Sequence, residues 1–280
     1  MRIASIQLDG RPVYGRVEDD QVVVADASLI TRYPALADLL AADAVAELAA
    51  ADGFKVPLED AVFDPVIPQP GKIICVGINY MAHMKEMGHS EPEYPLLFTR
   101  FADSMVGHGR PLIRPDNSGH YDYEGELALV IGRTAHHVSA AEALYHVAGY
   151  TCFMDGSLRD YQRHTSQFIP GKNFDRSGAM GPWLVTADEI PDPGVLKLET
   201  RLNGDVMQAA PVNDLKFDVP HLLEYISGFC VLQPGDVIST GTPAGVGFAR
   251  DPQVWLQPGD TLEVDIDGIG VLANPVAAES

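Results

Sequence analysis

The sequence predicts a mixed α+β protein that is mostly β, with a rolled and largely antiparallel architecture. Many short segments alternate apolar and polar residues, as strands with one buried face do. Turn sequences separate these segments, among them Asp9-Gly10, Asn203-Gly204 and two Pro-Gly-Asp turns. Helical segments are few and do not alternate regularly with the strands, which disfavours a doubly wound parallel sheet.

The chain is expected to form two domains. Residues 1–26 have the pattern of three short strands, and residues 34–51 are rich in alanine and leucine at helical spacing. Residues 64–71 (DPVIPQPG) hold three prolines and a glycine, a composition typical of a linker. We therefore predict a small N-terminal α/β domain over residues 1–68 and a larger domain over residues 69–280.

The larger domain contains several strand and helix signals and no internal repeat. Strands are predicted within residues 72–77, 95–100, 121–131, 149–155, 196–210 (a hairpin), 234–241 and 258–272. Helical structure is predicted at residues 79–89, after a capping box at 139–142, at 157–164, and from Asp218 to about Cys230. Residues 166–181 are rich in glycine, proline and polar residues, which predicts a long functional loop.

Composition restricts the partners and the compartment. The 39 acidic residues exceed the 19 basic ones, and the net charge of −20 disfavours nucleic acid or an anionic membrane surface as partner. The N-terminus lacks an apolar segment of signal-peptide length and no run approaches a membrane span, so we expect a cytoplasmic protein. Cys75, Cys152 and Cys230 lie in apolar segments without metal-binding spacing, which predicts buried free thiols.

The segment Tyr121–Ile131 (YDYEGELALVI) places acidic residues on a strand. Because side chains alternate along a strand, Glu124 and Glu126 project from one side, with Asp122 one step further along it. The apolar run Leu127–Ile131 is typical of a strand buried on both faces. Buried carboxylates repel one another unless a positive charge lies between them, and a divalent cation would supply it.

A third acid, Asp155, ends the apolar strand at residues 149–155. Glu124 and Glu126 alone could be solvated charges on an edge strand, but three carboxylates without a histidine or cysteine set favour a hard, oxygen-liganded ion. Mg²⁺ or Mn²⁺ is expected, Ca²⁺ is also compatible, and zinc is disfavoured. Asp122 is expected to support the site or to form a turn.

Other polar residues have two interpretations each. His83 and Glu86 are three residues apart on a predicted helix, so they form either an ordinary surface pair or a dyad in which the carboxylate orients the imidazole. Arg159, Gln162 and Lys172 are either surface residues or a group that binds an anionic substrate. Residues 240–247 (TGTPAGVG) lack the lysine of a phosphate-binding loop and favour close approach of backbone and a threonine hydroxyl to a small ligand.

Several segments, in this order, resemble the fumarylacetoacetate hydrolase family in its short form with a C-terminal catalytic domain. They are KIICVGINYMAH, DYEGELALVIGR, AGYTCFMDGSLRDYQ, PGKNF, GPWLVTADEIPDP, PGDVISTGTPAGVG and GIGVLANPV, spanning about residues 72–275. The resemblance implies a β-roll catalytic domain, a homodimer, and Mg²⁺ or Mn²⁺ held by Glu124, Glu126 and Asp155.

The resemblance also implies roles for the matching side chains. His83 and Glu86 match a dyad that activates water. Arg159, Gln162 and Lys172 match residues that bind substrate oxyanions and polarise the carbonyl. Substrate-binding positions are further implied for Thr242, which matches a contact to the substrate carboxylate, Tyr80 and Gly241. Arg100 departs from the family pattern, because many relatives have a lysine followed by prolines there, and altered distal contacts to the substrate are expected.

These roles predict a metal-dependent hydrolase that cleaves a carbon–carbon bond in a small anionic 2,4-dioxo acid, such as fumarylpyruvate or maleylpyruvate, and releases pyruvate. The ion would act as a Lewis acid, His83 would deprotonate the attacking water, and Lys172 would stabilise the oxyanion. The alternative is a decarboxylase or isomerase of oxaloacetate or 2-hydroxy-dienoate type, which forms the same enolate without attack by water. A third hypothesis is a carboxylate-binding protein without catalytic activity.

Overall fold

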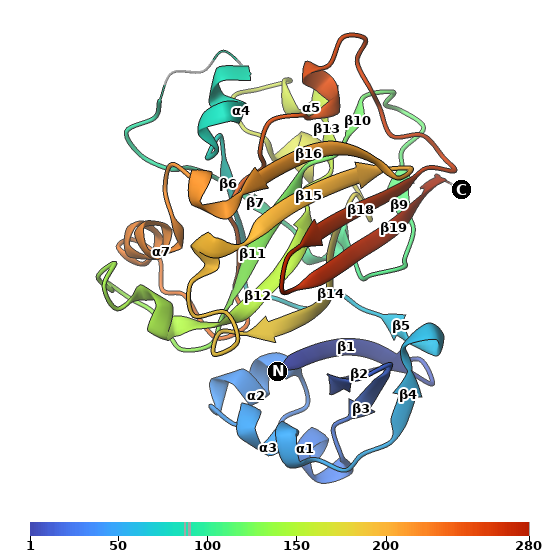
Figure 1. The fold of residues 1–280 in the computed structure, drawn as a ribbon, viewed down its shortest axis with the longest axis vertical. Coiled ribbons are helices and arrows are strands. Elements are labelled where there is room, and N and C mark those ends of the chain that lie inside the picture. Colours follow the sequence, from blue (N-terminus) through green and yellow to red (C-terminus); the bar gives the residue numbers. More distant parts are fainter. Residues whose placement is uncertain (87, 89–90, 280) are drawn as a thin grey trace.

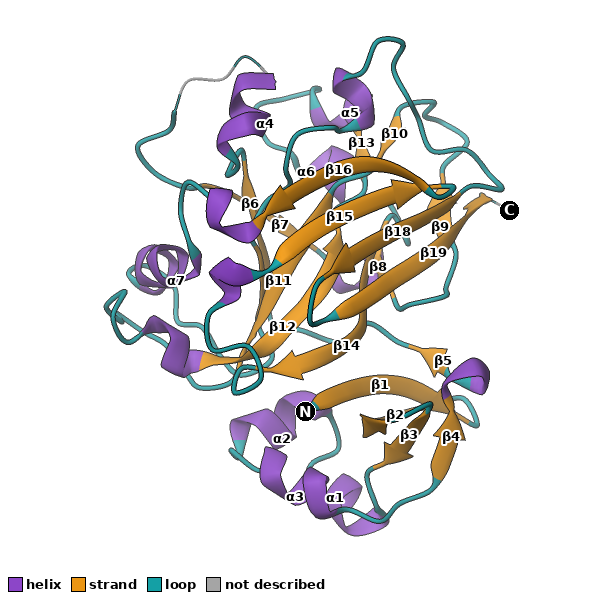
Figure 2. Cartoon of the chain, viewed as in Figure 1, coloured by secondary structure: helices purple, strands orange, loops and turns teal. Residues whose placement is uncertain are grey.

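The computed structural model describes residues 1–86, 88 and 91–279, and its strands form two packed sheets and a short ribbon (Figures 1 and 2). The larger sheet has the order β4 (Lys55–Pro57), β3 (Gln21–Val24), β2 (Arg11–Glu18), β1 (Arg2–Leu8), β14 (Gly178–Thr186), β12 (Val147–Met154), β11 (Gly125–Ile131), β17 (Val237–Ser239), β6 (Ile73–Gly77) and β7 (Leu96–Arg100). In addition, β5 (Val62–Phe63) pairs with β1, and β8 (Met105–Val106) pairs with β14.

The smaller sheet packs across the larger one. Its order is β16 (Asp205–Pro211), β15 (Lys197–Leu202), β18 (Thr261–Ile266), β19 (Gly270–Ala278) and β9 (Leu112–Arg114), and β10 (Tyr121–Asp122) forms a ribbon with β13 (Ser157–Leu158). Most pairs are antiparallel, and within the described residues β8, β9 and β17 make the parallel pairs. The predicted β-rich, rolled architecture is therefore confirmed.

The helices are short. They are α1 (Ala27–Arg32), α2 (Leu36–Ala41), α3 (Val45–Ala50), α4 (Met81–Glu86), α5 (Arg159–Gln162), α6 (Ile169–Lys172) and α7 (Val219–Ser227). Single 3-10 turns lie at Leu58–Asp60, Ala102–Ser104, Ala143–His146, Pro193–Val195, Val212–Asp214 and Gly247–Ala249. The cap that the sequence predicts for α7 is present, because the Asp218 side chain accepts a hydrogen bond from the His221 amide.

Three helix and loop predictions need correction. The segment 34–51 forms two helices, because Asp43 adopts a left-handed conformation (φ 52°) between them. The Ser139 hydroxyl does bond to the Glu142 carboxylate, at 2.8 Å, but only a 3-10 turn follows. The predicted loop 166–181 contains α6 and the start of β14. The end of the helix predicted at residues 79–89 falls partly outside the described residues.

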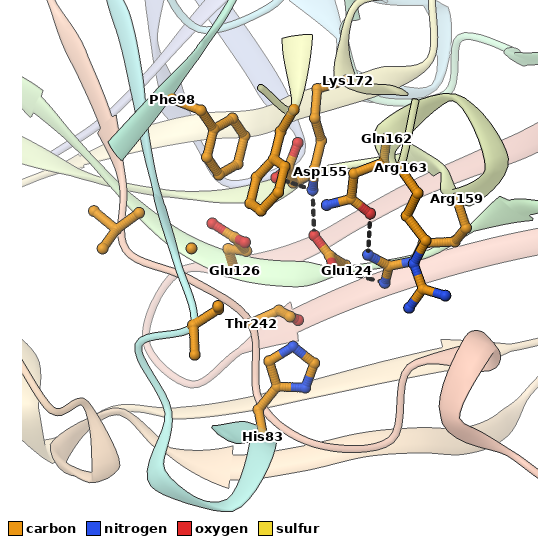
Figure 3. A pocket seen from close by; sticks show the side chains of 14 residues that line it. His83, Phe98, Glu124, Glu126, Asp155, Arg159, Gln162, Arg163, Lys172 and Thr242 are labelled. Atoms are coloured by element: carbon orange, nitrogen blue, oxygen red, sulfur yellow. Dashed lines mark hydrogen bonds and ion pairs between the residues drawn. The ribbon is translucent and has the colours of Figure 1, made fainter. Parts of the chain in front are cut away.

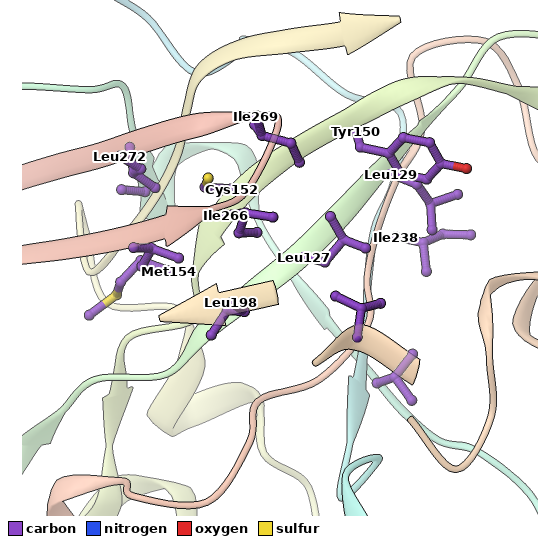
Figure 4. Packing of buried hydrophobic residues seen from close by; sticks show 14 of the residues in the cluster. Leu127, Leu129, Tyr150, Cys152, Met154, Leu198, Ile238, Ile266, Ile269 and Leu272 are labelled. Atoms are coloured by element: carbon purple, nitrogen blue, oxygen red, sulfur yellow. The ribbon is translucent and has the colours of Figure 1, made fainter. Parts of the chain in front are cut away.

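Strand β11 is buried on both faces, as the sequence predicts. Leu127, Leu129 and Ile131 join the hydrophobic cluster between the two sheets, which also contains Tyr150 and Ile266 (Figure 4). Ala128 and Val130 point the other way, into a cluster with Leu36, Leu39 and Leu48 of the N-terminal helices. This packing fixes β11 from both sides. Strand β11 contains Glu126 and begins directly after Glu124.

The N-terminal segment (blue in Figure 1) continues the larger sheet. Strand β1 pairs with β14 through Arg2 opposite Val185 and Ile3 opposite Leu184. The domain boundary at residue 68 stays a prediction, and the two parts share one sheet and one hydrophobic cluster. Cys75 and Cys152 are buried free thiols, whereas Cys230 is only partly buried. No helix in the described part of the chain is long and apolar enough to cross a bilayer.

Candidate active site

Three acidic side chains converge where β11 and β12 meet. Antiparallel pairing sets Gly125 opposite Met154 and Glu126 opposite Phe153. The Asp155 amide donates to the Glu124 carbonyl at 2.9 Å, so the residue that follows β12 lies beside the residue that precedes β11. One oxygen from each of Glu124, Glu126 and Asp155 lies within 4.8 Å of the other two, and all three side chains are buried. The structure therefore brings the three predicted ligands together.

This donor set fits a hard divalent cation. Mg²⁺, Mn²⁺ and Ca²⁺ prefer carboxylate oxygens, and three of them within this distance can bind one ion. On Glu126, Oε2 accepts hydrogen bonds from the Ser239 hydroxyl and from the Gly241 amide at 2.9 Å. These bonds orient the carboxylate and leave Oε1 for a ligand role. The predicted alternative of solvated edge charges is excluded by burial.

Buried cations surround the acids. The Lys172 ammonium lies 2.5 Å from Glu124 Oε2 and 2.6 Å from Asp155 Oδ2 (Figure 3). Arg159 Nη2 lies 2.7 Å from Glu124 Oε1, and Arg159 Nε donates to Asp122 Oδ2 at 2.8 Å. Both cations lie where the sequence predicts them, beside the acids, and here they pair with those acids.

The charges of this cluster shift several pKa values. Burial disfavours the charged form of Glu124, but Arg159 and Lys172 outweigh it and hold the pKa well below its usual range. On Glu126, burial and the neighbouring Asp155 and Glu124 act together and raise the pKa well above its usual range. Burial lowers the pKa of Lys172, but the adjacent carboxylates outweigh that effect and raise it. The ammonium therefore stays charged.

His83 and Glu86 form the predicted dyad on α4. His83 Nδ1 lies 3.0 Å from Glu86 Oε2, and the Gly245 amide donates to Glu86 Oε1 at 2.9 Å. Burial opposes ionisation of Glu86, but the bonds from His83 and Gly245 outweigh it and lower the pKa. Because Nδ1 faces Glu86, Nε2 is the nitrogen of His83 that remains for a ligand.

A cavity of about 250 Å³ contains most of the predicted site. Its lining residues are Val76, Gly77, Ile78, His83, Phe98, Glu124, Glu126, Asp155, Arg159, Gln162, Arg163, Phe168, Lys172 and Thr242. Figure 3 shows the carboxylates and Lys172 opposite His83 across this space. Gln162 accepts a hydrogen bond from Arg159 Nη1 at 3.0 Å, which leaves its amide nitrogen for a ligand.

Two predicted substrate-binding residues lie outside the lining. Tyr80 is buried in the core with its hydroxyl unpaired among the described residues. Gly241 acts through its amide on Glu126, and its φ of 104° suits glycine at this tight turn. Thr242 lines the cavity, and its hydroxyl donates to the Gly125 carbonyl at 2.9 Å.

Arg100 has a different place from the one predicted. Altered distal contacts to a substrate were expected from it, but its side chain is absent from the cavity lining and lies behind Asp155. Asp122 supports the site as predicted, since it accepts from Arg159 and from the amides of Gly247 and Phe248. Phe98, Phe168 and Arg163 were not predicted, and only the adjacency of Arg163 to Gln162 could have indicated it.

A β-roll with buried acids, a histidine–carboxylate dyad and paired cations in one cavity defines the site of an enzyme. The family model described as fumarylacetoacetate (FAA) hydrolase C-terminal matches residues 72–277. The chain therefore belongs to the fumarylacetoacetate hydrolase family.

Individual relatives differ in their reactions. A human protein named oxaloacetate tautomerase FAHD2A, mitochondrial, is 41% identical over 223 residues, which cover 79% of this chain and 71% of the relative. The structure of 5-carboxymethyl-2-hydroxymuconate delta-isomerase from Mycobacterium smegmatis is 32% identical, with a TM-score of 0.81 and full coverage of both chains.

A third relative bears on the metal. Maleylpyruvate hydrolase from Sphingobium sp. SYK-6, solved with manganese(II) and pyruvate, is 27% identical, with a TM-score of 0.80 and full coverage of both chains. The relatives thus include a tautomerase, an isomerase and a hydrolase. They favour the alternative, a decarboxylase or isomerase that acts without attack by water, over the hydrolase that the sequence predicts first.

Proposed function

We propose that this protein transfers a proton at the carbon next to the carbonyl of an oxaloacetate-type 2-oxo acid, interconverting its keto and enol forms. One observation carries the proposal: His83, oriented by Glu86, lines the same cavity as the acidic triad. The human relative named as an oxaloacetate tautomerase supports the choice of substrate. A homodimer, and a location in the cytoplasm, stay predictions.

The residues of the cavity have separate tasks. A divalent cation held by Glu124, Glu126 and Asp155 would polarise the 2-oxo group and acidify the neighbouring C3–H bond. His83 Nε2 accepts the C3 proton, and the Glu86 carboxylate stabilises the imidazolium that forms. The proton then passes from His83 to the carbonyl oxygen, two bonds away from C3, which gives the enol. The reverse sequence returns the keto acid.

The cations around the acids keep the cavity ready for this reaction. Lys172 and Arg159 hold Glu124 ionised, so this carboxylate carries no proton at neutral pH. The amide of Gln162 can donate to the substrate oxygen on which negative charge develops. Phe98 and Phe168 add aromatic rings to the lining of the cavity, and a less hydrated wall would strengthen these polar contacts.

Hydrolysis of an acylpyruvate is the second candidate, supported by the maleylpyruvate hydrolase structure. It needs the same residues and an additional water, which His83 would deprotonate. Decarboxylation of oxaloacetate would instead break the C3–C4 bond, release CO₂ and leave a pyruvate enolate, which takes up a proton at C3. It would share the stabilisation of an enolate in this cavity, but not the removal of the C3 proton by His83.

Two measurements separate these reactions: nuclear magnetic resonance in D₂O follows the exchange of C3 protons, and ultraviolet absorbance follows the enol. We expect the Mn²⁺- or Mg²⁺-loaded protein to accelerate exchange of the C3 protons of oxaloacetate and the decay of its enol absorbance. Release of pyruvate from acetylpyruvate or maleylpyruvate, without accelerated exchange in oxaloacetate, would establish the hydrolase instead. A carboxylate-binding protein without activity would show neither, and Glu124→Ala would then leave its ligand affinity unchanged.

A further inference from the structure

The buried charges of the site balance a single substrate carboxylate. Among the described residues, the buried charged side chains around the triad are four carboxylates (Asp122, Glu124, Glu126, Asp155) and three cations (Arg100, Arg159, Lys172). The Glu86 side chain of the dyad is partly exposed to solvent and is not one of them. When all four acids are ionised, one negative charge remains, and a divalent cation turns it into one positive charge. One carboxylate of a bound 2-oxo acid neutralises this charge. A second carboxylate on the same substrate finds no further unpaired buried cation in the described part of the chain, so a cation nearer the solvent would attract it.

Arg163 is the cation of the cavity that this balance does not use. It follows α5 directly and lines the same cavity as Gln162 and Arg159, on the same side in Figure 3. Within the described residues no carboxylate forms an ion pair with it, whereas Arg159 and Lys172 are each paired with two. Its charge is therefore open to a ligand.

The Arg163 side chain is also held in place. Its guanidinium carbon lies 4.0 Å from the centroid of the Phe248 ring, a cation–π geometry. Phe248 is itself fixed, because its amide donates to the buried Asp122 at 3.1 Å. An arginine held on an aromatic face keeps its five N–H donors in one plane, which suits a carboxylate with two oxygens.

We infer that Arg163 binds the distal carboxylate of a dicarboxylic 2-oxo acid and selects such substrates over 2-oxo monoacids. The inference rests on the proposed function, because the 2-oxo acid end must lie at the acidic triad. Arg163 is a solvent-exposed residue that also lines the cavity, so it lies where a carboxylate projecting outward from the buried end would meet it. Arg163 is thus a specificity-determining residue, and His83 acts on either kind of substrate.

A matched pair of ligands tests this role in the Mg²⁺-loaded protein. 2-Oxoglutarate and 2-oxopentanoate share the 2-oxo acid end, and only the first has a distal carboxylate. Calorimetry on the unmodified protein should show about 5- to 10-fold tighter binding of 2-oxoglutarate, the range of one charge-assisted contact near the surface. Arg163→Gln should abolish this preference without weakening 2-oxopentanoate, and Arg163→Lys should keep part of it.

Arg11→Gln, which removes an exposed arginine from β2, is the charge-matched control and should keep the full preference. Equal preference in the unmodified protein and in Arg163→Gln would overturn the inference, as would loss of affinity for both ligands alike. The outcome is separable from that of the proposed function. A preference that depends on Arg163, without C3 exchange in oxaloacetate, would support Arg163 and contradict the tautomerase.

Discussion

Arg100 Nη1 lies 2.7 Å from Asp155 Oδ1, and both side chains are completely buried. The same nitrogen donates to the Gly156 carbonyl at 2.9 Å, and Nη2 donates to the Ser177 hydroxyl at 2.8 Å. The guanidinium therefore fixes one oxygen of Asp155 from behind while Lys172 contacts the other. Arg100 is a positioning residue for a predicted metal ligand.

Replacing Arg100 should destabilise the protein. Arg100→Met leaves Asp155 with an unpaired buried charge on that side and should destabilise the protein by about 3 kcal/mol. Arg100→Lys keeps the charge but cannot reach Gly156 and Ser177 together, so we expect a loss of about 1–2 kcal/mol. Urea denaturation measures the free energy of unfolding of each variant. Equal stability of Arg100→Met and the unmodified protein would contradict this role.

Metal binding should depend on pH through Glu126. Its pKa is raised in the metal-free protein by burial and by Asp155 and Glu124, so the carboxyl holds a proton until the pH exceeds that raised value. A cation requires the deprotonated form, and binding therefore releases a proton and strengthens as pH rises. Calorimetry of Mn²⁺ binding in buffers of different ionisation enthalpy measures the proton. Mn²⁺ affinity that is independent of pH, without proton release, over the whole range in which the protein stays folded would contradict the expected linkage.

Substitution of His83 should affect proton transfer and leave the metal in place. His83→Asn removes the base and should slow C3 exchange in oxaloacetate by roughly 100-fold or more. Mn²⁺ affinity should be unchanged, because His83 is not part of the acidic triad. Glu86→Gln keeps a hydrogen-bond partner for the imidazole and should reduce exchange by a smaller factor. Loss of Mn²⁺ affinity in His83→Asn would mean that His83 is a ligand.

The glycine between the two acidic residues should resist substitution. A Cβ at Gly125 would lie 2.0 Å from Thr200 Oγ1 of the opposite sheet, so Gly125→Ala should destabilise the protein by about 1–3 kcal/mol. Thr200→Ala should cost little on its own, because that buried hydroxyl has no hydrogen-bond partner in the described structure. The double variant should recover part of the loss in thermal unfolding. Additive losses would place the strain elsewhere.

The sequence predicts much of the strand framework and the acidic triad. Local signals suffice there: Asn203-Gly204 forms the expected turn, with φ values of 53° and 87°, and the apolar run of β11 is buried on both faces. Glu124 and Glu126 follow from strand periodicity, and Asp155 follows from its place at the end of a second apolar strand. The conformation of these elements is therefore determined largely by short stretches of neighbouring residues.

Long-range contacts account for what the sequence does not predict. Arg100 is 55 residues from Asp155, and nothing in its own segment distinguishes a buried ion pair from a substrate contact. The Ser139 hydroxyl bonds to the Glu142 carboxylate and not to the backbone amide that a capping box requires, and the chain enters β12 after a single 3-10 turn. The choice between hydrolysis and tautomerisation depends on water access and on the substrate, since both reactions use the same side chains.

Pairing of β1 with β14 has a consequence for solubility. Strand β14 would otherwise present unpaired backbone groups at Leu184 and Val185, and an exposed strand edge is a template for intermolecular association. A recombinant chain starting at residue 69 would also uncover the apolar side chains of Ala128 and Val130 beneath the N-terminal helices. Within the described residues, the first 68 contribute no side chain to the cavity. We nevertheless expect them to protect the β-roll from aggregation, because they cover its strand edge and its apolar face.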